Sequence, residues 1–499
     1  MAAEEVPDRI AEIFNGTTIF ITGASGFVGK ALIEKLLRLT NLRKMYLLLR
    51  EKKGKSPEQR LQDIFTNVLY DKLKSLKPHA LNKCTAIQGD VSQIDLGISK
   101  EDRERLKNEV DFIFHSAATT RFDDTLKYAV IMNTRGTMYM LRLAEECKKL
   151  KLFVHVSTAY AFPREKVLYE KAYEPIADPQ EVLSSLSWIK DEAMQEMQDK
   201  ILGDIPNAYT FSKSLAEALV YEKVGKIPVI IGRPAVVIPA LWDPLPGWFN
   251  NLQGPMGLFA ASGKGVIRSM YMDSKSYANL VPIDATVNAL MVFSWYYLKH
   301  KKDAPWIYNI CVPQRDIKLT WTEVMEHGKD VINTRVPFNN IMWYPGGAMT
   351  KNRLYNKVNI FLFQIIPAVF IDMIFVVLGY KPILYNIQMR IKKGAEMFEF
   401  YTTKAWDFDT KNVEYVRSKL NSKEKQLYQL EADNFDVKDY LANGILYCRR
   451  HILKETDDML PAARRNMKIM FALDRTVKIT FFVFIAYYFY KYVFCSIFS

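Results

Sequence analysis

Cysteine and histidine are scarce in this chain of 499 residues, which has five Cys and six His. The cysteines (Cys84, Cys147, Cys311, Cys448 and Cys495) form no Cys-x-x-Cys pair. This excludes a disulfide framework and a zinc ribbon, and it fits a reducing compartment. Because the histidines are scattered without the spacing of metal ligands, we expect no metal site.

Dense runs of one charge are also missing. Lys and Arg number 68 against 55 Asp and Glu, so the formal net charge of +13 is spread thinly. Such an excess favours acidic partners such as phosphates, CoA or anionic membranes, but it differs from the basic arm of a nucleic-acid-binding protein. We therefore expect no nucleic-acid partner. With 49% hydrophobic and 25% charged residues, the composition excludes a mainly disordered chain and a multi-span membrane protein.

The two ends of the chain differ in polarity. The N-terminus, Met1–Asp8, is acidic and has no apolar run, which excludes a secretory signal peptide. From Ile479 to Ser499, in contrast, the only charge is Lys491, and a helix of this length can cross a bilayer core of about 30 Å. Basic residues precede this run, which favours a tail anchor with the body in the cytosol. The alternative is a buried or interfacial C-terminal helix.

Short β-type runs alternate with helical stretches in the first half of the chain. The strand candidates are Thr18–Thr22, Lys44–Arg50, Cys84–Gln88, Asp111–His115, Phe153–Val156 and Val229–Ile231. Helical periodicity marks Val28–Leu39, Ser56–Lys77 and Thr125–Lys149. This alternation predicts an α/β fold with a doubly wound parallel sheet of the Rossmann type.

The alternation of strand and helix signals ends after about residue 240. The segment Asp243–Gly257 is rich in Pro and Gly, which predicts a substrate lid or pocket wall. A second apolar stretch, Val358–Leu378, is interrupted by polar residues and Pro367, so a buried or membrane-dipping helix is more natural than a span. Residues 380–460 predict a small, mainly helical domain.

A glycine-rich turn follows the first predicted strand and opens the first helix. Glycines at positions 23, 26 and 29 allow a tight turn and let main-chain N–H groups approach a pyrophosphate at the helix N-terminus. The candidate cofactor contacts in this turn are Thr22, Gly23, Ser25, Gly26, Phe27, Val28 and Gly29.

The ends of the next strands supply further candidates. Arg50, helped by Lys52 or Lys53, suits the 2′-phosphate of NADPH, although the acidic Glu51 directly follows Arg50. Asp90 and Val91 follow the third strand and are expected near the adenine. The fourth strand ends at Ser116 and Ala117, where the chain passes the middle of the cofactor.

A Tyr-x-x-x-Lys pair, Tyr209 and Lys213, supplies candidate catalytic groups. On a helix, residues i and i+4 share a face, and a nearby ammonium group lowers the pKa of a phenol. The phenol can then donate a proton to a carbonyl as a hydride arrives. A third hydroxyl is expected after the fifth strand, where register favours Thr158 and leaves Ser157 as the alternative. His155 precedes them and is more typical of a packed strand residue than of a base.

This ordered set resembles an extended short-chain dehydrogenase/reductase and, within that superfamily, a membrane-associated fatty acyl-CoA reductase of eukaryotes. The resemblance covers nearly the whole chain, but the chain has Asn250 where the family usually has Asp. The motifs that carry it are Thr22–Gly29, Leu47–Lys55, Val156–Tyr160, Pro206–Lys213, Gly232–Pro234, Asp243–Gly257, Val281–Asp284, Ile366–Asp372 and Trp406–Phe408.

The resemblance implies an NADPH-binding reductase domain with its lid at 1–350, a helical sterile-type domain at 351–475 and a membrane anchor at 476–499. It also implies that Arg233 belongs to the cofactor site. The implied reaction reduces a long-chain acyl-CoA to a primary fatty alcohol with two NADPH, through a bound aldehyde, and releases CoA. The catalytic domain is expected to face the cytosol from the endoplasmic reticulum or the peroxisomal membrane, and a homo-oligomer is compatible with the sequence.

Two other functions compete with this interpretation. One is another membrane-associated extended reductase that acts on a sterol or a nucleotide sugar. A sugar site would need few apolar walls, and it would leave the helical domain unexplained. The other is a non-catalytic NADP-binding scaffold, but such proteins often lose the Tyr or the Lys, and both are present here.

Overall fold

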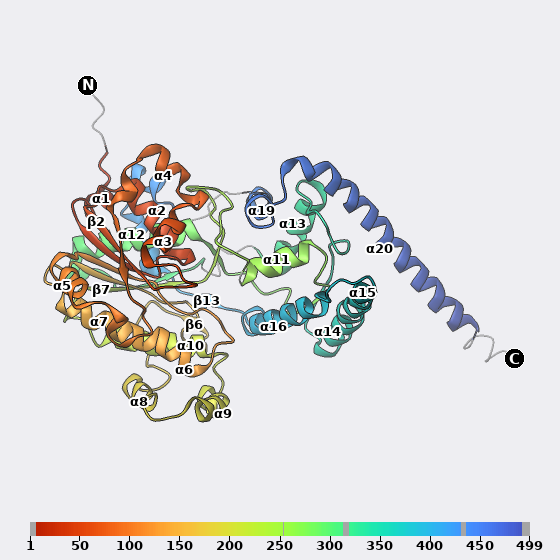
Figure 1. Ribbon diagram of the computed structural model, residues 1–499, viewed down its shortest axis with the longest axis horizontal. Coiled ribbons are helices and arrows are strands. Elements are labelled where there is room, and N and C mark those ends of the chain that lie inside the picture. The colour runs from red at the N-terminus through yellow and green to blue at the C-terminus, as the bar shows by residue number, and fades with distance from the viewer. Residues whose placement is uncertain (1–5, 253, 313–318, 431–435, 492–499) are drawn as a thin grey trace, which may run out of the picture. The chain divides into compact units, whose positions relative to one another are not determined.

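The computed structural model describes residues 6–252, 254–312, 319–430 and 436–491 (Figure 1). The chain forms two compact units that are interleaved in the sequence. The first comprises Met1–Asn250, Asn279–Lys318 and Trp406–Asn434, and the second comprises Asn251–Ala278, Leu319–Ala405 and Phe435–Ser499. The expected division into consecutive segments at 1–350, 351–475 and 476–499 therefore differs from the observed one, because the chain passes repeatedly between the units.

A seven-stranded parallel sheet forms the centre of the first unit, in the order β11-β7-β5-β4-β1-β2-β3. Its strands are β1 (Thr18–Thr22), β2 (Lys44–Leu49), β3 (Cys84–Gln88), β4 (Phe112–His115), β5 (Leu152–Val156), β7 (Val229–Pro234) and β11 (Ile307–Ile310). The order runs outward in both directions from β1 and β4, so the topological switch point lies between them. The predicted doubly wound α/β fold is confirmed, and β11 is the strand that the sequence pattern did not reveal.

Helices cover both faces of this sheet. On one face, side chains of α5, α7 and α10 share a buried core with inward-facing strand residues such as Phe20, Ile113 and Phe153. Figure 1 shows α2 and α12 on the opposite face. The helices of this unit are α1 (Arg9–Glu12), α2 (Phe27–Leu39), α3 (Pro57–Phe65), α4 (Asp71–Leu76), α5 (Lys100–Glu109), α6 (Leu126–Ala129), α7 (Gly136–Glu146), α8 (Pro179–Ser185), α9 (Asp191–Leu202), α10 (Ala208–Tyr221), α12 (Ile283–His300), α17 (Lys411–Ser418) and α18 (Ser422–Leu427).

The second unit is mainly helical. A short parallel pair, β9 (Ser269–Tyr271) and β12 (Ala348–Thr350), accompanies the helices. A π-turn at Phe361–Ile365 joins α14 to α15 without a break in the rod. The helices are α11 (Pro255–Gly263), α13 (Trp321–Thr334), α14 (Arg353–Ile360), α15 (Ile366–Val377), α16 (Leu384–Thr402), α19 (Val437–Tyr447) and α20 (Leu460–Phe489).

Among the described residues, the continuous rod Arg353–Val377 passes the length and hydropathy criteria for a membrane span, and only 17% of its apolar window is buried. The predicted C-terminal apolar run begins inside α20, where Phe482 and Phe484 are exposed. The end of that run, residues 492–499, lies outside the described residues.

Candidate active site

The glycine turn between β1 and α2 has the geometry of a phosphate cradle. Gly23 adopts a φ of +74°, and a Cβ there would lie 2.8 Å from main-chain atoms of Ser116 and Ala117. A Cβ at Gly29 would lie 2.2 Å from the carbonyl oxygen of Gly23. Gly26 caps α2 without a side-chain hydrogen bond, so the helix N-terminus fits the pyrophosphate of a dinucleotide. The other predicted contacts of the turn, Ser25, Phe27 and Val28, are partly exposed.

Thr22, the last residue of β1, stabilises the glycine turn through its hydrogen bonds. Its side chain is fully buried, and its Oγ1 lies 2.7 Å from Nδ1 of His115. Its carbonyl oxygen accepts a hydrogen bond of 2.8 Å from Oγ of Ser116. Thr22 therefore ties the end of β1 to the end of β4, and we assign it a positioning role in place of the predicted cofactor contact.

His115 and His155 lie beside each other on adjacent strands, with ring centroids 5.5 Å apart. Burial, and then the charge of Lys213, lower the pKa of His115 to about 3. The same causes hold the pKa of His155 well below its usual range. Both imidazoles are neutral packed groups, as the sequence suggested for His155.

The end of β2 brings two guanidinium groups together. Arg50 pairs with Asp90 at 2.9 Å, while Arg60 on α3 donates to the carbonyl oxygen of Arg50 at 2.5 Å and to Oγ of Ser25 at 3.3 Å. Burial, and then the charge of Arg50, lower the pKa of Arg60. An anion held by both groups would relieve this repulsion. Sequence reasoning missed Arg60, because its spacing from Arg50 does not reveal which face of α3 meets β2.

The remaining predicted cofactor contacts lie along the same edge of the sheet. Lys52 is exposed, and its main chain pairs with Lys55 in a short turn. Val91 is buried, with its carbonyl oxygen 3.0 Å from where a Cβ at Gly136 would lie. Ser116 and Ala117 follow β4 and are partly exposed.

Helix α10 brings the Tyr-x-x-x-Lys pair to the carboxyl end of β5. Lys213 is buried, and its ammonium group donates a hydrogen bond of 2.7 Å to the carbonyl oxygen of Val156, the last residue of β5. Burial lowers the pKa of Lys213 to about 8. Tyr209 lies one turn earlier and is partly exposed, with its ring centroid 5.7 Å from that of Phe122. The pair therefore meets the strand end that leads into Ser157 and Thr158.

The two candidate hydroxyls differ in their surroundings. The buried Oγ of Ser157 has no hydrogen-bond partner among the residues that the structure describes, and its N–H donates to the carbonyl oxygen of Gly232 at 2.8 Å. Thr158 Oγ1 accepts the N–H of Tyr160 at 3.3 Å, which leaves its own proton to donate. Both hydroxyls therefore keep a proton that can be donated to a substrate carbonyl, and the choice of Thr158 rests on the register of the strand.

Asn133 is a buried residue of this region that sequence reasoning missed. It lies in a π-turn, Val130–Arg135, between α6 and α7. Its side-chain amide bonds both the N–H and the carbonyl of Thr119, at 2.8 and 3.1 Å, and it donates to Oγ of Ser212 at 2.9 Å. Asn133 thus fixes the chain after β4 against α10, next to Lys213. A lone Asn inside a helical pattern carries no signal for such a role.

Arg233 occupies a different place from the one that the resemblance implied. It is fully buried, and its guanidinium pairs with Glu217 of α10 at 2.6 Å. It also donates to the carbonyl oxygens of Tyr169 and Lys171, both at 3.1 Å. These partners make Arg233 a positioning residue that locks α10 onto β7, and not the predicted cofactor ligand.

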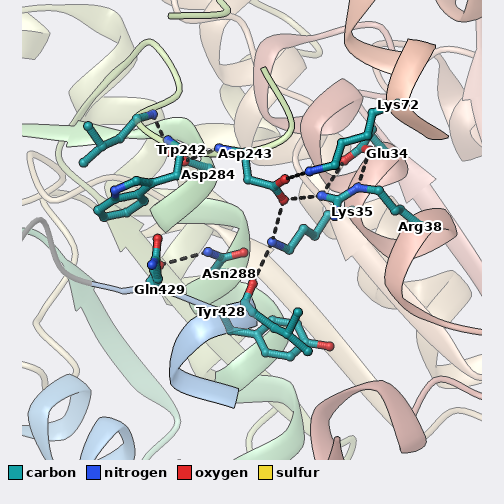
Figure 2. Close-up of polar contacts among 12 residues, drawn as sticks. Glu34, Lys35, Arg38, Lys72, Trp242, Asp243, Asp284, Asn288, Tyr428 and Gln429 are labelled. Atoms are coloured by element: carbon teal, nitrogen blue, oxygen red, sulfur yellow. Dashed lines mark hydrogen bonds and ion pairs between the residues drawn. The ribbon is translucent and has the colours of Figure 1, made fainter. Parts of the chain in front are cut away.

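Residues 241–250, which we call the strap, contain the first part of the predicted lid, which begins at Asp243. Figure 2 shows that the strap is anchored at its start. The carboxylate of Asp284, in the first turn of α12, accepts the main-chain N–H groups of Leu241, Trp242 and Asp243 at 3.0, 2.7 and 3.1 Å. The strap is therefore a fixed wall of the first unit, and the rest of the predicted lid, from Asn251, belongs to the second unit.

The strap is clamped to the cofactor helix α2 by charge. The carboxylate of Asp243 pairs with Arg38, with Lys35 at 3.1 Å and with Lys72 at 2.7 Å (Figure 2). Lys35 also donates to the carbonyl oxygen of Leu427 at 2.8 Å. Three cations around one carboxylate bind three separate segments of the first unit together.

The far end of the strap reaches the glycine turn. Trp248 is fully buried, its ring centroid lies 5.2 Å from that of Phe27, and its indole N–H donates to Asn67 at 3.0 Å. Lys30, in the first turns of α2, donates to Oδ1 of Asn250 at 2.8 Å. The residue at which this chain departs from the family pattern is thus a direct partner of the cofactor helix.

Comparison with known proteins identifies the family and the fold of this chain. A family model described as male sterility protein matches residues 21–290, and a second model, named Sterile and described in the same words, matches residues 363–455. Among solved structures, the terminal R domain of the myxalamid pathway shares 19% identity and a TM-score of 0.59, covering 89% of this chain and 92% of that one. The reductase domain of a nonribosomal peptide synthetase from Mycobacterium tuberculosis shares 18% identity and a TM-score of 0.58, covering 89% and 96%. At these identities the likeness establishes the fold.

Curated relatives match over almost the whole chain. Fatty acyl-CoA reductase 1 of Xenopus laevis and that of Homo sapiens are each 34% identical over 461 residues, covering 92% of this chain and 89% of theirs. Fatty acyl-CoA reductase wat of Drosophila melanogaster is 32% identical over 469 residues, covering 94% and 90%. The chain carries the nucleotide-binding fold, the Tyr–Lys pair and both family domains in order, and it therefore belongs to the fatty acyl-CoA reductase family.

Proposed function

We propose that this protein reduces long-chain fatty acyl-CoA to the primary alcohol, consuming two NADPH and releasing CoA. The observation that carries the proposal is the placement of Tyr209 and Lys213 at the carboxyl end of β5, beside Thr158. That end of the sheet also holds the glycine turn, so a dinucleotide cradled there and a substrate carbonyl would share one site. Membership of the family supports the choice of an acyl-CoA over other carbonyl compounds.

The side chains of this site have distinct tasks. When bound, reduced nicotinamide supplies the hydride. The hydroxyl groups of Tyr209 and Thr158 donate hydrogen bonds to the carbonyl oxygen of the substrate, where negative charge develops. Lys213, whose ammonium group is held by the carbonyl of Val156, stabilises the phenolate form of Tyr209 and so makes its proton easier to transfer.

The same hydroxyls serve both reductions. In the first, the carbonyl oxygen of the thioester gains negative charge, and collapse of the tetrahedral adduct breaks the C–S bond and releases CoA as a thiolate, which takes a proton from solvent. The aldehyde stays bound. In the second, Tyr209 transfers its proton to the aldehyde oxygen to give the alcohol, and solvent reprotonates the phenol.

NADPH is the proposed reductant because Arg50 and Arg60 stand together at the end of β2. A 2′-phosphate offers the anion that two adjacent guanidinium groups favour, whereas the 2′-hydroxyl of NADH does not. Ser25, which accepts a hydrogen bond from Arg60, links this pair to the glycine turn. The pair is therefore positioned for the adenosine side of the cofactor.

We also propose that the C-terminal run from Ile479 anchors the protein in the membrane of the endoplasmic reticulum or the peroxisome, with the chain before this run in the cytosol. Its exposed side chains from Ile479 to Tyr490 are almost all apolar or aromatic. Basic residues at 464–478 precede it, as is typical of the cytosolic side of a span. A membrane-bound enzyme would meet its substrate where long acyl chains partition.

The proposal is tested by incubating the purified protein with NADPH and a series of acyl-CoAs, followed by analysis of lipid products and free thiol. Alcohol and CoA in equal amounts, with two NADPH oxidised for each, are expected for long chains. A parallel series with NADH separates the choice of reductant from the choice of substrate. Absence of both alcohol and aldehyde across all chain lengths would refute the assignment.

A further inference from the structure

We propose that the second unit carries a membrane face that rests in the plane of an anionic bilayer and is independent of the C-terminal anchor. The face lies on the rod formed by α14, the π-turn and α15. Its exposed apolar side chains are Leu354, Val358, Phe361, Leu362, Phe363, Ile366, Val369, Phe370, Met373, Ile374, Val376 and Val377. This inference does not rest on the proposed reaction.

The membrane face exposes more apolar surface than soluble proteins usually present to solvent. Phe363 is 56% exposed, Phe370 58% and Val377 86%. Soluble proteins rarely expose a contiguous apolar surface of this extent unless it binds a membrane or another protein. No charged residue interrupts the sequence from Val358 to Ile371.

The opposite side of the rod is polar and bonded within the second unit. Asn356 accepts a hydrogen bond of 2.6 Å from the hydroxyl of Ser269. Gln364 accepts the N–H of Arg268, also at 2.6 Å. Both side chains are buried. The rod is therefore held along its length by the main body of the unit.

A third buried side chain holds the end of the rod. The carboxylate of Asp372 accepts the N–H groups of Ile383, Leu384 and Tyr385, at 3.0, 3.0 and 2.8 Å, and so caps the start of α16. A rod that crossed the bilayer would have to break these bonds or carry them into hydrocarbon, where unpaired polar groups are costly. The geometry therefore points to a rod that lies along the membrane surface and immerses one side only.

The charges around the membrane face indicate which kind of lipid surface it binds. Between Lys351 and Lys393 there are seven Lys or Arg residues and a single acidic residue, the buried Asp372. Two of the seven, Lys351 and Arg353, form ion pairs with Asp273 and Glu399, which lie outside the rod. Lys357 and Lys381 flank the apolar side chains at either end of the rod and are exposed. Basic residues at the rim of an apolar helix face favour the headgroups of anionic lipids. A second copy of this unit would bring like charges together, which disfavours self-association.

Vesicle binding of the full-length protein tests the membrane face. In a background that carries Phe482→Asp and Phe484→Asp to weaken the C-terminal anchor, we expect residual binding to phosphatidylcholine vesicles with about 25% phosphatidylserine. Adding Phe363→Glu and Phe370→Glu should lower the partition coefficient about tenfold or more. The matched control adds Ile94→Glu and Trp188→Glu, which alter side chains of the first unit that are 71% and 73% exposed. Equal binding of the two variants, with NADPH binding intact in both, would overturn the proposal.

The depth of the rod distinguishes resting on the membrane from crossing it. A fluorophore is attached in turn at Leu362→Cys, Phe370→Cys and Val377→Cys of the vesicle-bound protein, and quenching by lipids brominated at different depths is measured. At 1.5 Å per residue the outer two sites are about 22 Å apart along the helix. Equal, shallow depths are expected, whereas a steady gradient would show a span. Loss of a dimer without vesicles in the Phe363→Glu, Phe370→Glu variant would instead show that a second copy covers the face.

Discussion

The ammonium group of Lys213 donates a hydrogen bond of 2.7 Å to the main-chain carbonyl of Val156. This bond fixes α10 at the end of β5 and aligns Tyr209, one turn earlier on the same helix, with the residues that follow the strand. Burial makes the charge on Lys213 costly. In the proposed mechanism, the hydrogen bond to Val156 holds this ammonium group near the phenol that donates a proton.

Replacing Tyr209 with Phe should abolish turnover and leave NADPH binding largely intact, because only the proton donor is removed. We expect kcat to fall by about 10²-fold or more, measured as NADPH oxidation and alcohol formation. NADPH affinity is followed by its fluorescence in the same variant. Loss of cofactor binding would show that Tyr209 has a structural role instead.

The pKa of Lys213, lowered to about 8 by burial, predicts how NADPH binding responds to pH. If the charged ammonium group holds the cofactor, the NADPH Kd should rise as the pH increases past about 8. The free energy of unfolding should instead increase with pH between about 8 and the ordinary lysine pKa of 10.5, because over this range the unfolded chain binds more protons than the folded one. Titration of the Kd in Tyr209→Phe removes the contribution of the phenol. A Kd that stays constant up to pH 10 in that variant would exclude Lys213 from cofactor binding.

Replacing Arg60 with Ala should raise the KM for NADPH about tenfold and leave that for NADH nearly unchanged, because a charge-assisted bond to the 2′-phosphate is lost. Arg50→Ala should behave in the same way. Steady-state kinetics with both cofactors provide the measurement, and Lys100→Ala, an exposed cation on α5, is the matched control. An equal effect on both cofactors would contradict the assignment of the arginine pair.

Replacing Asp243 with Asn should destabilise the first unit by about 2 kcal/mol, since Lys35 and Arg38 would remain buried without their shared carboxylate. Thermal unfolding of the full chain should show a lower Tm. Asp63→Asn provides the control, because the Lys55–Asp63 pair is more than half exposed on both sides and such pairs contribute little. A Tm equal to that of the control would show that the charge clamp does not hold the strap.

Much of the fold could be predicted because its signals are local. The alternation of apolar runs and helical periodicity located most strands of the sheet, and the helical stretch predicted from Ser56 does start there, with Ser56 as the cap of α3. The seventh strand, Ile307–Ile310, was missed because it is short and lies after the pattern changes. The two-unit division was also missed, since it depends on contacts between segments far apart in the chain.

In the candidate site, too, features that depend on adjacent residues were predicted, and features that depend on contacts between distant segments were not. Spacing alone identified the glycine turn and the Tyr209–Lys213 pair, because a tight turn and an i, i+4 pair are properties of adjacent residues. Arg60 and Asn133 were not found, since each acts across a packing interface. Arg233 received the wrong role for a related reason: its sequence neighbours place it on a strand but do not reveal the buried Glu217 beside it.

Composition and local pattern therefore determined the class of fold, the order of the motifs and the chemistry of the side chains available. The tertiary structure alone decided which of these side chains meet and how much water surrounds them. It buried Lys213 enough to lower its pKa, turned Arg60 toward Arg50, and clamped the predicted lid to α2 through Asp243. Desolvation and charge pairing are set by distances in space, and a linear sequence does not contain these distances until the chain has packed.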